Sequence, residues 1–143
     1  MPLKATGING TQEYQWRGRM AVRIDSSQPQ AFTASFDLTG TSLAGELILY
    51  TPLGSTAATL TWTPHTALMR TNDDVRSFNS LNDLIQQAVG TDIPVDALFA
   101  WLAGEDFIAA GWRADLSQHD SGRITARRLT PLPAAELRLV LEK

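Results

Sequence analysis

Apolar and polar residues alternate most clearly on either side of a short turn, in the stretch LAGELILYTPLGSTAATLTWT at residues 43–63. Alternation of this kind predicts a pair of strands, each with two unlike faces. The apolar positions are Leu43, Gly45, Leu47 and Leu49 before the turn and Ala58, Leu60 and Trp62 after it. Pro52 and Gly54 suit the second and fourth positions of a tight turn. Leu53 then lies at the third position and points to water, either as an idle surface residue or as a probe that enters something apolar.

The same alternation predicts strands before and after this hairpin. We expect a flexible segment at residues 1–13, strands at 14–24, 31–38, 66–71, 112–116 and 123–129, and a last strand at 136–142. The inner faces should carry Trp16, Gly18, Met20, Val22, Ile24, Phe32, Ala34, Phe36, Leu38, Leu137, Leu139 and Leu141. Because short connections join the first four strands, they should be antiparallel neighbours in a meander.

Helical spacing replaces the alternation in the middle of the chain. Ser80 is a favourable N-cap, and Gly90 is a suitable stop for the helix between them. Pro94 suits the start of a second short helix that Gly104 closes. The apolar stripes of the two helices consist of Leu81, Leu84, Ile85, Ala88 and Val89, and of Val95, Leu98, Phe99, Trp101 and Leu102. Both stripes are too wide to lie on a polar face.

The order of these elements predicts a mainly β fold. A sheet of about eight or more antiparallel strands tends to curl towards a barrel, because open edges invite unwanted pairing. We expect the two apolar helices to lie over the mouth of that barrel. The interior is then either a solid core or a lidded cavity, and periodicity does not choose between them.

Composition and charge exclude several classes of protein. With 143 residues, of which 43% are hydrophobic and 19% charged, the chain has the size and composition of one globular domain, expected at residues 14–143. The formal net charge of −3 argues against a nucleic-acid partner. The absence of cysteine excludes disulfides and thiolate chemistry. No run of 18 apolar residues is present, so no membrane-spanning helix is expected.

No pattern of residues points to catalysis, to a metal or to a cofactor. His65 and His119 fall in expected loops without a partner at ligand spacing, and both should be solvated. The adjacent carboxylates at 73–74 and 105–106 point apart, so we interpret them as turn and cap residues instead of an acid/base pair. The sequence has neither a G-x-S-x-G elbow nor a glycine-rich phosphate loop. We therefore expect a protein that is not an enzyme and needs no cofactor.

A modest basic face is expected from Arg17, Arg19, Arg23, Arg127 and Arg128. Such a face can meet an acidic partner protein or anionic lipid head groups. It can equally be a plain solvated face, which is the interpretation we favour from the sequence.

Three blocks, in this order and spacing, resemble the LolB family of outer-membrane lipoprotein receptors. They are W-x-G-R at residues 16–19, P-L-G-S at 52–55 and G-x-x-I-P-V-x-x-L-x-x-W-L-x-G at 90–104. Each block is weak alone, but the ordered set is fairly specific and covers the chain from residue 14 to 143.

The resemblance implies a half-open curled antiparallel β-barrel with a short helical lid inserted mid-chain. It implies a monomer at the periplasmic face of the outer membrane that accepts acylated lipoproteins from a LolA-type carrier. The cargo would then pass into the outer-membrane lipids. The alternative that stays open is a non-catalytic, barrel-type protein interaction module with a filled core.

Two sets of site residues follow from the resemblance. The membrane-insertion loop would be Pro52, Leu53 and Gly54. The acyl-chain cavity would be lined by Trp16, Met20, Phe32, Phe36, Leu47, Leu49, Trp62, Leu84, Ile85, Leu98, Phe99, Trp101, Leu102 and Trp112. Without the resemblance, the aromatic members of the second set would be interpreted as ordinary core.

The sequence departs from the family in two respects. The strand around Phe36 carries Asp37-Leu38 where a more aromatic pattern is expected in relatives. The family is anchored by a lipid on an N-terminal cysteine, and this sequence contains no cysteine. Two explanations stay open: a sequence trimmed past the lipidated residue, or a naturally soluble variant.

Overall fold

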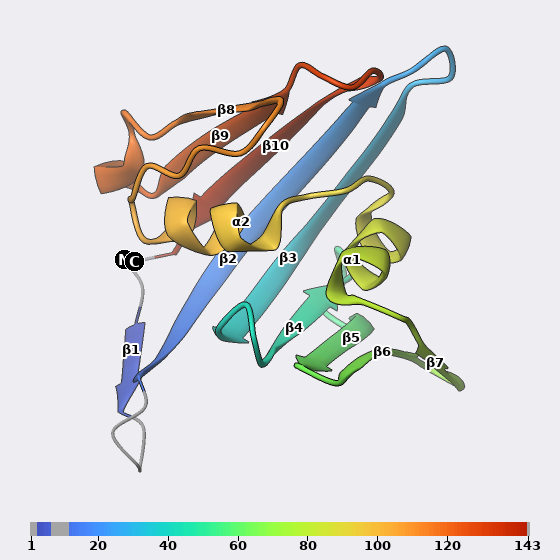
Figure 1. Ribbon diagram of the computed structural model, residues 1–143. Helices are drawn as coiled ribbons and strands as arrows, with labels where there is room; N and C mark the ends of the chain where they lie inside the picture. The colour runs from blue at the N-terminus through green and yellow to red at the C-terminus, as the bar shows by residue number, and fades with distance from the viewer. Residues whose placement is uncertain (1–2, 7–11, 143) are drawn as a thin grey trace.

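The computed structural model describes residues 3–6 and 12–142, and these form one antiparallel sheet with two helices. The strands are β1 (Leu3–Thr6), β2 (Gln12–Asp25), β3 (Gln30–Gly40), β4 (Gly45–Tyr50), β5 (Thr56–Thr63), β6 (Thr66–Thr71), β7 (Asp74–Ser77), β8 (Trp112–Asp115), β9 (Arg123–Arg128) and β10 (Ala134–Leu141). Their order in the sheet is β7-β6-β5-β4-β3-β2-β10-β9-β8, with β1 paired to β2 beside this path (Figure 1). The predicted meander of the first strands is confirmed.

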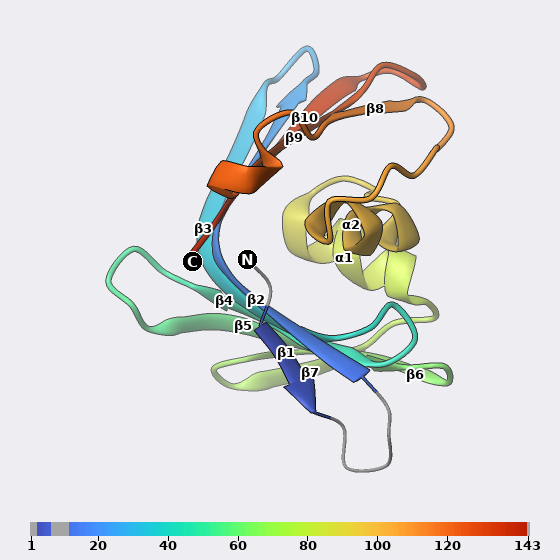
Figure 2. The same cartoon turned by 90° about the vertical axis from the view of Figure 1, so that its left-hand side faces the viewer.

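The sheet curls without closing, because its two edges, β7 and β8, do not pair with each other. In Figure 2 the sheet bends around the two helices and leaves one side open. A mainly β, half-open curled barrel with a helical insert is therefore what the structure shows. The predicted inner side chains of β2, β5 and β10 are buried, and they form one continuous core with the helices.

The close pairing of β2 with β10 joins the two ends of the chain in the middle of the sheet. Gly18 lies opposite Leu141 in this pairing. A Cβ at Gly18 would clash with the carbonyl oxygen of Val140 on β10. The glycine in the W-x-G-R block is thus required by close backbone approach, which only a residue without a side chain permits.

Both predicted helices are present and end where their caps require. In α1 (Leu81–Val89), the Ser80 hydroxyl accepts a hydrogen bond from the Asp83 N–H at 3.1 Å. Gly90 ends this helix with φ of 90°, the left-handed conformation that glycine adopts most readily. Pro94 precedes α2 (Val95–Leu102) as its N-cap, as the sequence predicts.

Several boundaries differ from the predictions. Leu43 lies outside β4 in a tight loop, where Thr41 N–H donates to Ala44 O, and its side chain is exposed instead of inward. The last residue of β8 is Asp115, so Leu116 is outside the strand. The expected loop after β8 contains a short 3-10 helix, His119–Ser121.

The N-terminal segment contains one further strand, β1. Within residues 1–13, for which flexibility stays a prediction, Leu3–Thr6 forms an unpredicted strand that pairs with the start of β2, from Gln12 to Gln15. The rest of the predicted segment, residues 1–2 and 7–11, lies outside the described residues. Four residues are too few to show a periodic pattern, which is why alternation did not predict β1.

Candidate functional site

The apolar interior lies between the inner side of the sheet and the two helices. Eight of the predicted cavity residues line it: Met20, Phe36, Leu47, Trp62, Ile85, Leu98, Phe99 and Leu102. Four further lining residues were assigned to inner faces but not to the cavity: Leu38, Leu81, Val95 and Leu139. All these side chains are hydrophobic, so the space can interact only with apolar groups.

The other six predicted cavity residues lie elsewhere in or around the core. Trp16 packs edge-on against Phe99 with ring centroids 5.7 Å apart. Trp101 and Trp112 pack on each other, with ring centroids 6.0 Å apart. Leu84 is buried in the core. Phe32 and Leu49 line a separate hollow of about 300 Å³ beside the β4–β5 loop.

The interior is almost completely filled. The volume left among the lining side chains is about 20 Å³. One water molecule needs roughly 10–15 Å³ of such space, so this volume does not hold an acyl chain. A lipid tail can enter only if the helices move away from the sheet or the lining side chains repack.

Few polar contacts hold the helices in place. His119 Nε2 lies 2.9 Å from the carbonyl oxygen of Leu102, the last residue of α2. Trp101 Nε1 donates to the carbonyl oxygen of Phe107 at 3.3 Å, just beyond the helix. The prediction of a solvated side chain is wrong for His119, which is half-buried against the end of α2, whereas His65 is exposed in a turn. His119 and Leu102 are 17 residues apart in the sequence, and a contact over that separation leaves no periodic pattern from which it could be predicted.

The β4–β5 loop is a compact turn that projects Leu53 into solvent. Gly54 N–H donates to Thr51 O at 2.9 Å, and Thr51 N–H donates to Ser55 O at 2.8 Å. Gly54 has φ of 91°, a conformation that disfavours other residues. The Leu53 side chain is 97% exposed. The predicted turn and the outward leucine are therefore both present.

A polar chain that the sequence analysis missed anchors the base of this loop. The hydroxyl of Tyr50 donates to Asp37 Oδ2 at 2.7 Å, and Arg17 Nε donates to Asp37 Oδ1 at 2.7 Å. The hydrogen bond to Asp37 raises the pKa of Tyr50 above its ordinary value. The three residues come from three adjacent strands, so only the sheet register, Arg17 opposite Asp37, could have revealed them.

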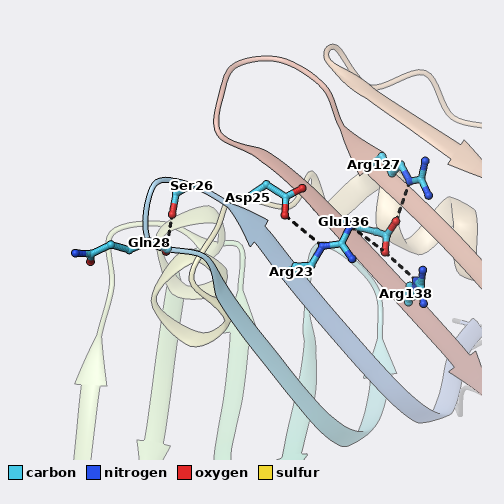
Figure 3. Close-up of polar contacts among 7 residues, drawn as sticks. All are labelled: Arg23, Asp25, Ser26, Gln28, Arg127, Glu136 and Arg138. Atoms are coloured by element: carbon cyan, nitrogen blue, oxygen red, sulfur yellow. Dashed lines mark hydrogen bonds and ion pairs between the residues drawn. The ribbon is translucent and has the colours of Figure 1, made fainter.

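The outer side of the sheet carries a second unpredicted cluster, centred on Glu136. Its carboxylate accepts from Arg127 Nε and Arg138 Nε, each at 2.8 Å, and Arg23 Nη2 lies 3.9 Å away. Figure 3 shows the three arginines around this one acid. Burial opposes ionisation of Glu136, but the hydrogen bond from Arg127 and the charges of Arg138 and Arg23 outweigh it and lower its pKa.

In the part of the chain that the structure describes, no three histidine, aspartate or glutamate side chains gather where they could hold a metal ion. The carboxylates at 73–74 and 105–106 are exposed; Asp73 lies in the turn before β7, and Asp74 is the first residue of that strand. Within the same residues, neither helix has the length and apolar character that crossing a membrane demands.

Comparison with known proteins finds a match over most of the chain. The family model of outer membrane lipoprotein LolB matches residues 12–137. The outer-membrane lipoprotein LolB of Shewanella loihica is 29% identical over 73% of this chain and 47% of the relative, and that of Shewanella sediminis is 28% identical over 73% and 46%. The Bordetella petrii protein of the same name is 26% identical over 94% of this chain and 81% of its own.

The chain spans about half the length of the two Shewanella relatives that it matches. The family model, in contrast, extends from β2 into β10 and so includes both helices and the β4–β5 loop. On this match, the chain belongs to the family of outer membrane lipoprotein LolB.

Proposed function

We propose that this chain accepts acylated lipoproteins from a periplasmic carrier of the LolA type and inserts them into the outer membrane. It would work as a monomer at the periplasmic face of that membrane. The observation that carries the proposal is a wholly hydrophobic interior, enclosed by a curled sheet and two helices, in a member of the LolB family.

The energetics of acyl chains explain why such a protein is needed. Each acyl methylene exposed to water costs about 0.8 kcal/mol, so a lipidated protein cannot cross an aqueous space unaccompanied. A receptor with an apolar interior takes the chains from the carrier, and the membrane then takes them from the receptor. Each step requires only that the next apolar site binds more strongly, so no nucleotide hydrolysis is needed.

The closed interior implies that cargo entry displaces the helices. The contacts between α2 and the sheet are apolar, and Leu98 and Phe99 on α2 face the residual space. An acyl chain can replace these contacts with others of the same kind. The hydrogen bond between His119 and Leu102 would be broken or would move together with the helix.

Leu53 supplies the contact with the bilayer. Its compact turn holds the side chain away from the sheet, and the Tyr50–Asp37 hydrogen bond fixes the base of that turn. Burial of one leucine contributes about 1.5–3 kcal/mol, enough to disturb local lipid packing but not to hold the protein on the membrane.

A transfer assay tests the proposal. A lipoprotein bound to the LolA-type carrier is mixed with this protein, with or without liposomes, and the cargo is followed by sedimentation. We expect the wild type to accept and release cargo, and Leu53→Glu to accept it in solution but to release it poorly.

The matched control is Leu132→Glu, which places the same charge on a different exposed loop, at a side chain that is 79% exposed. This variant should behave like the wild type. Failure of the wild type to accept any lipoprotein would overturn the proposed function. If Leu53→Glu and Leu132→Glu reduce the release of cargo equally, the β4–β5 loop has no special role in release.

The small residual volume favours one second candidate, an interaction module with a filled core. In that case the interior, with its residual volume of about 20 Å³, never opens, and the outer surfaces bind a partner protein. A hydrophobic probe dye or an acylated peptide separates the two functions, since a lipid receptor binds both and a filled module binds neither.

A further inference from the structure

The outer side of β2, β8, β9 and β10 presents rows of arginines in register. Arg113, Arg127 and Arg23 lie in one row, with Glu136 between the last two. Four residues after Glu136 on β10, Val140 lies between Arg123 of β9 and Arg19 of β2. We call the seven outward arginines of these strands, Arg17, Arg19, Arg23, Arg113, Arg123, Arg127 and Arg138, the arginine face.

The arginine face has more positive than negative charge. Among the described side chains on this side, the acids of the four strands are Asp25, Asp115 and Glu136, and Asp37 of β3 pairs with Arg17. Glu142 follows β10 directly and lines a hollow together with Arg17. Seven arginines against five carboxylates leave a local excess of two positive charges, in a chain whose formal net charge is −3. The negative charge of the protein therefore lies elsewhere, and this face stands out electrostatically.

Three of these arginines have no acidic partner in the described part of the chain: Arg19, Arg113 and Arg123. Arg113 and Arg123 line an open hollow of about 600 Å³, together with Arg127 and Arg138. Arg19 and Arg138 line a second hollow of about 390 Å³. The two hollows share Arg138 and Val140, so they form one continuous basic surface.

This surface continues to the Leu53 loop. Pro52 lines the second hollow with Arg19, and it lines a third hollow with Arg17. In Figure 2 the β4–β5 loop stands out from the side of the sheet that faces away from the helices. An exposed leucine at a loop tip thus adjoins a row of guanidinium groups on the same side of the molecule.

We propose that the arginine face binds the anionic phospholipid surface while Leu53 enters the bilayer. This inference rests on the proposed function for the role of Leu53. Guanidinium groups bind phosphate oxygens through paired hydrogen bonds, and the hollows between the arginine side chains offer room for lipid head groups. The combination of basic and inserting apolar side chains is how peripheral proteins bind membranes when neither contact suffices alone.

A membrane accounts for the face better than an acidic protein does. Each basic residue within a Debye length of an anionic membrane strengthens binding by roughly fivefold. An acidic protein would explain the arginines but not the exposed leucine beside them. Oriented this way, the receptor keeps its helices and the open side of its sheet turned away from the lipid (Figure 2).

The test is flotation of the purified protein with vesicles of phosphatidylcholine containing 30% phosphatidylglycerol, compared with pure phosphatidylcholine. The variant is Arg19→Gln with Arg123→Gln, which changes two arginines without an acidic partner on either side of Val140. The matched control is Arg70→Gln with Arg76→Gln, which removes the same charge from β6 and β7 near the far edge of the sheet.

We expect the wild type to prefer the anionic vesicles and the Arg19/Arg123 variant to bind them about 25-fold more weakly, from roughly fivefold for each arginine. The control should lose less than about threefold, and added salt should weaken wild-type binding. Equal binding by the variant and the control overturns the inference.

The solution transfer assay separates this inference from the proposed function. The Arg19/Arg123 variant should accept lipoprotein from the carrier as fast as the wild type does. If it accepts cargo slowly but binds vesicles normally, the face docks an acidic protein and the inference is wrong. If Leu53→Glu lowers release while the arginine variant binds vesicles normally, the proposed function stands without the inference.

Discussion

The two sides of β10 differ in chemistry, because one packs into the apolar core and the other carries charged side chains. On the inner side, Leu137, Leu139 and Leu141 are buried in the core. On the outer side, Arg138 and Val140 are exposed, and Glu136 is buried not by apolar groups but by arginine side chains from its own and adjacent strands. The inner side excludes water along its whole length with hydrocarbon, whereas the outer side meets solvent everywhere except at Glu136, where ion pairs replace water.

The difference teaches what each side can bind. The lining of the residual space on the inner side is wholly hydrophobic, so a ligand there could be selected only by its apolar character. The outer side has charges at fixed positions along the strands. Under the proposed function and the further inference, the inner side would serve the cargo and the outer side the membrane.

The largest expected effect tests the difference between the two sides directly. Leu139→Ala, at a side chain that is 2% exposed, should lower the free energy of unfolding by about 2–5 kcal/mol, because it leaves a cavity in the core. Val140→Ala, at the adjacent position with 47% exposure, should cost less than about 1 kcal/mol. Urea unfolding followed by tryptophan fluorescence measures both. If both variants lowered the free energy of unfolding equally, the inner side of β10 would not be the core.

The next effect concerns Glu136 and depends on pH. Glu136→Gln should cost about 1.5–3 kcal/mol at pH 7, because it removes charge-assisted hydrogen bonds to Arg127 and Arg138. The pKa of Glu136 is lower in the folded protein than in the unfolded chain, so its ionised form stabilises the fold above the unfolded value, near 4.3. That contribution disappears as the pH falls through the folded pKa.

Thermal unfolding from pH 7 to pH 3 checks this dependence. The wild type and Glu136→Gln should converge at low pH. Asp25→Asn, at an exposed carboxylate near Arg23, is the control and should change stability little at any pH. If the difference in thermal stability between the wild type and Glu136→Gln is the same at every pH, the cluster around Glu136 acts through packing alone.

The smallest effect sharpens the role of the loop base. Tyr50→Phe removes one hydrogen bond to Asp37 and should cost about 0.5–1 kcal/mol in chemical unfolding. Since the β4–β5 loop then has a looser base, release of cargo into liposomes should slow more than acceptance in solution does. A variant with wild-type release would show that the backbone hydrogen bonds of the turn fix Leu53 unaided.

Local pattern determined much of this protein by itself. Alternation in residues 14–24 and 43–63 predicted both faces of β2 and β5, because a strand with one buried face must repeat every two residues. Ser80 and Gly90 marked the ends of α1 through backbone groups that any helix must satisfy. Pro52 and Gly54 fixed the turn, and with it the exposure of Leu53, for equally local reasons.

Only the tertiary structure decided which residues meet across the sheet. Glu136 gains its arginines because β10 inserts between β2 and β9, and His119 reaches Leu102 because the chain folds back along α2. It also decided that the interior is closed, with about 20 Å³ left among the predicted cavity residues. Periodicity reports which face of an element is buried, but register, long-range partners and residual volume depend on how the elements pack against one another.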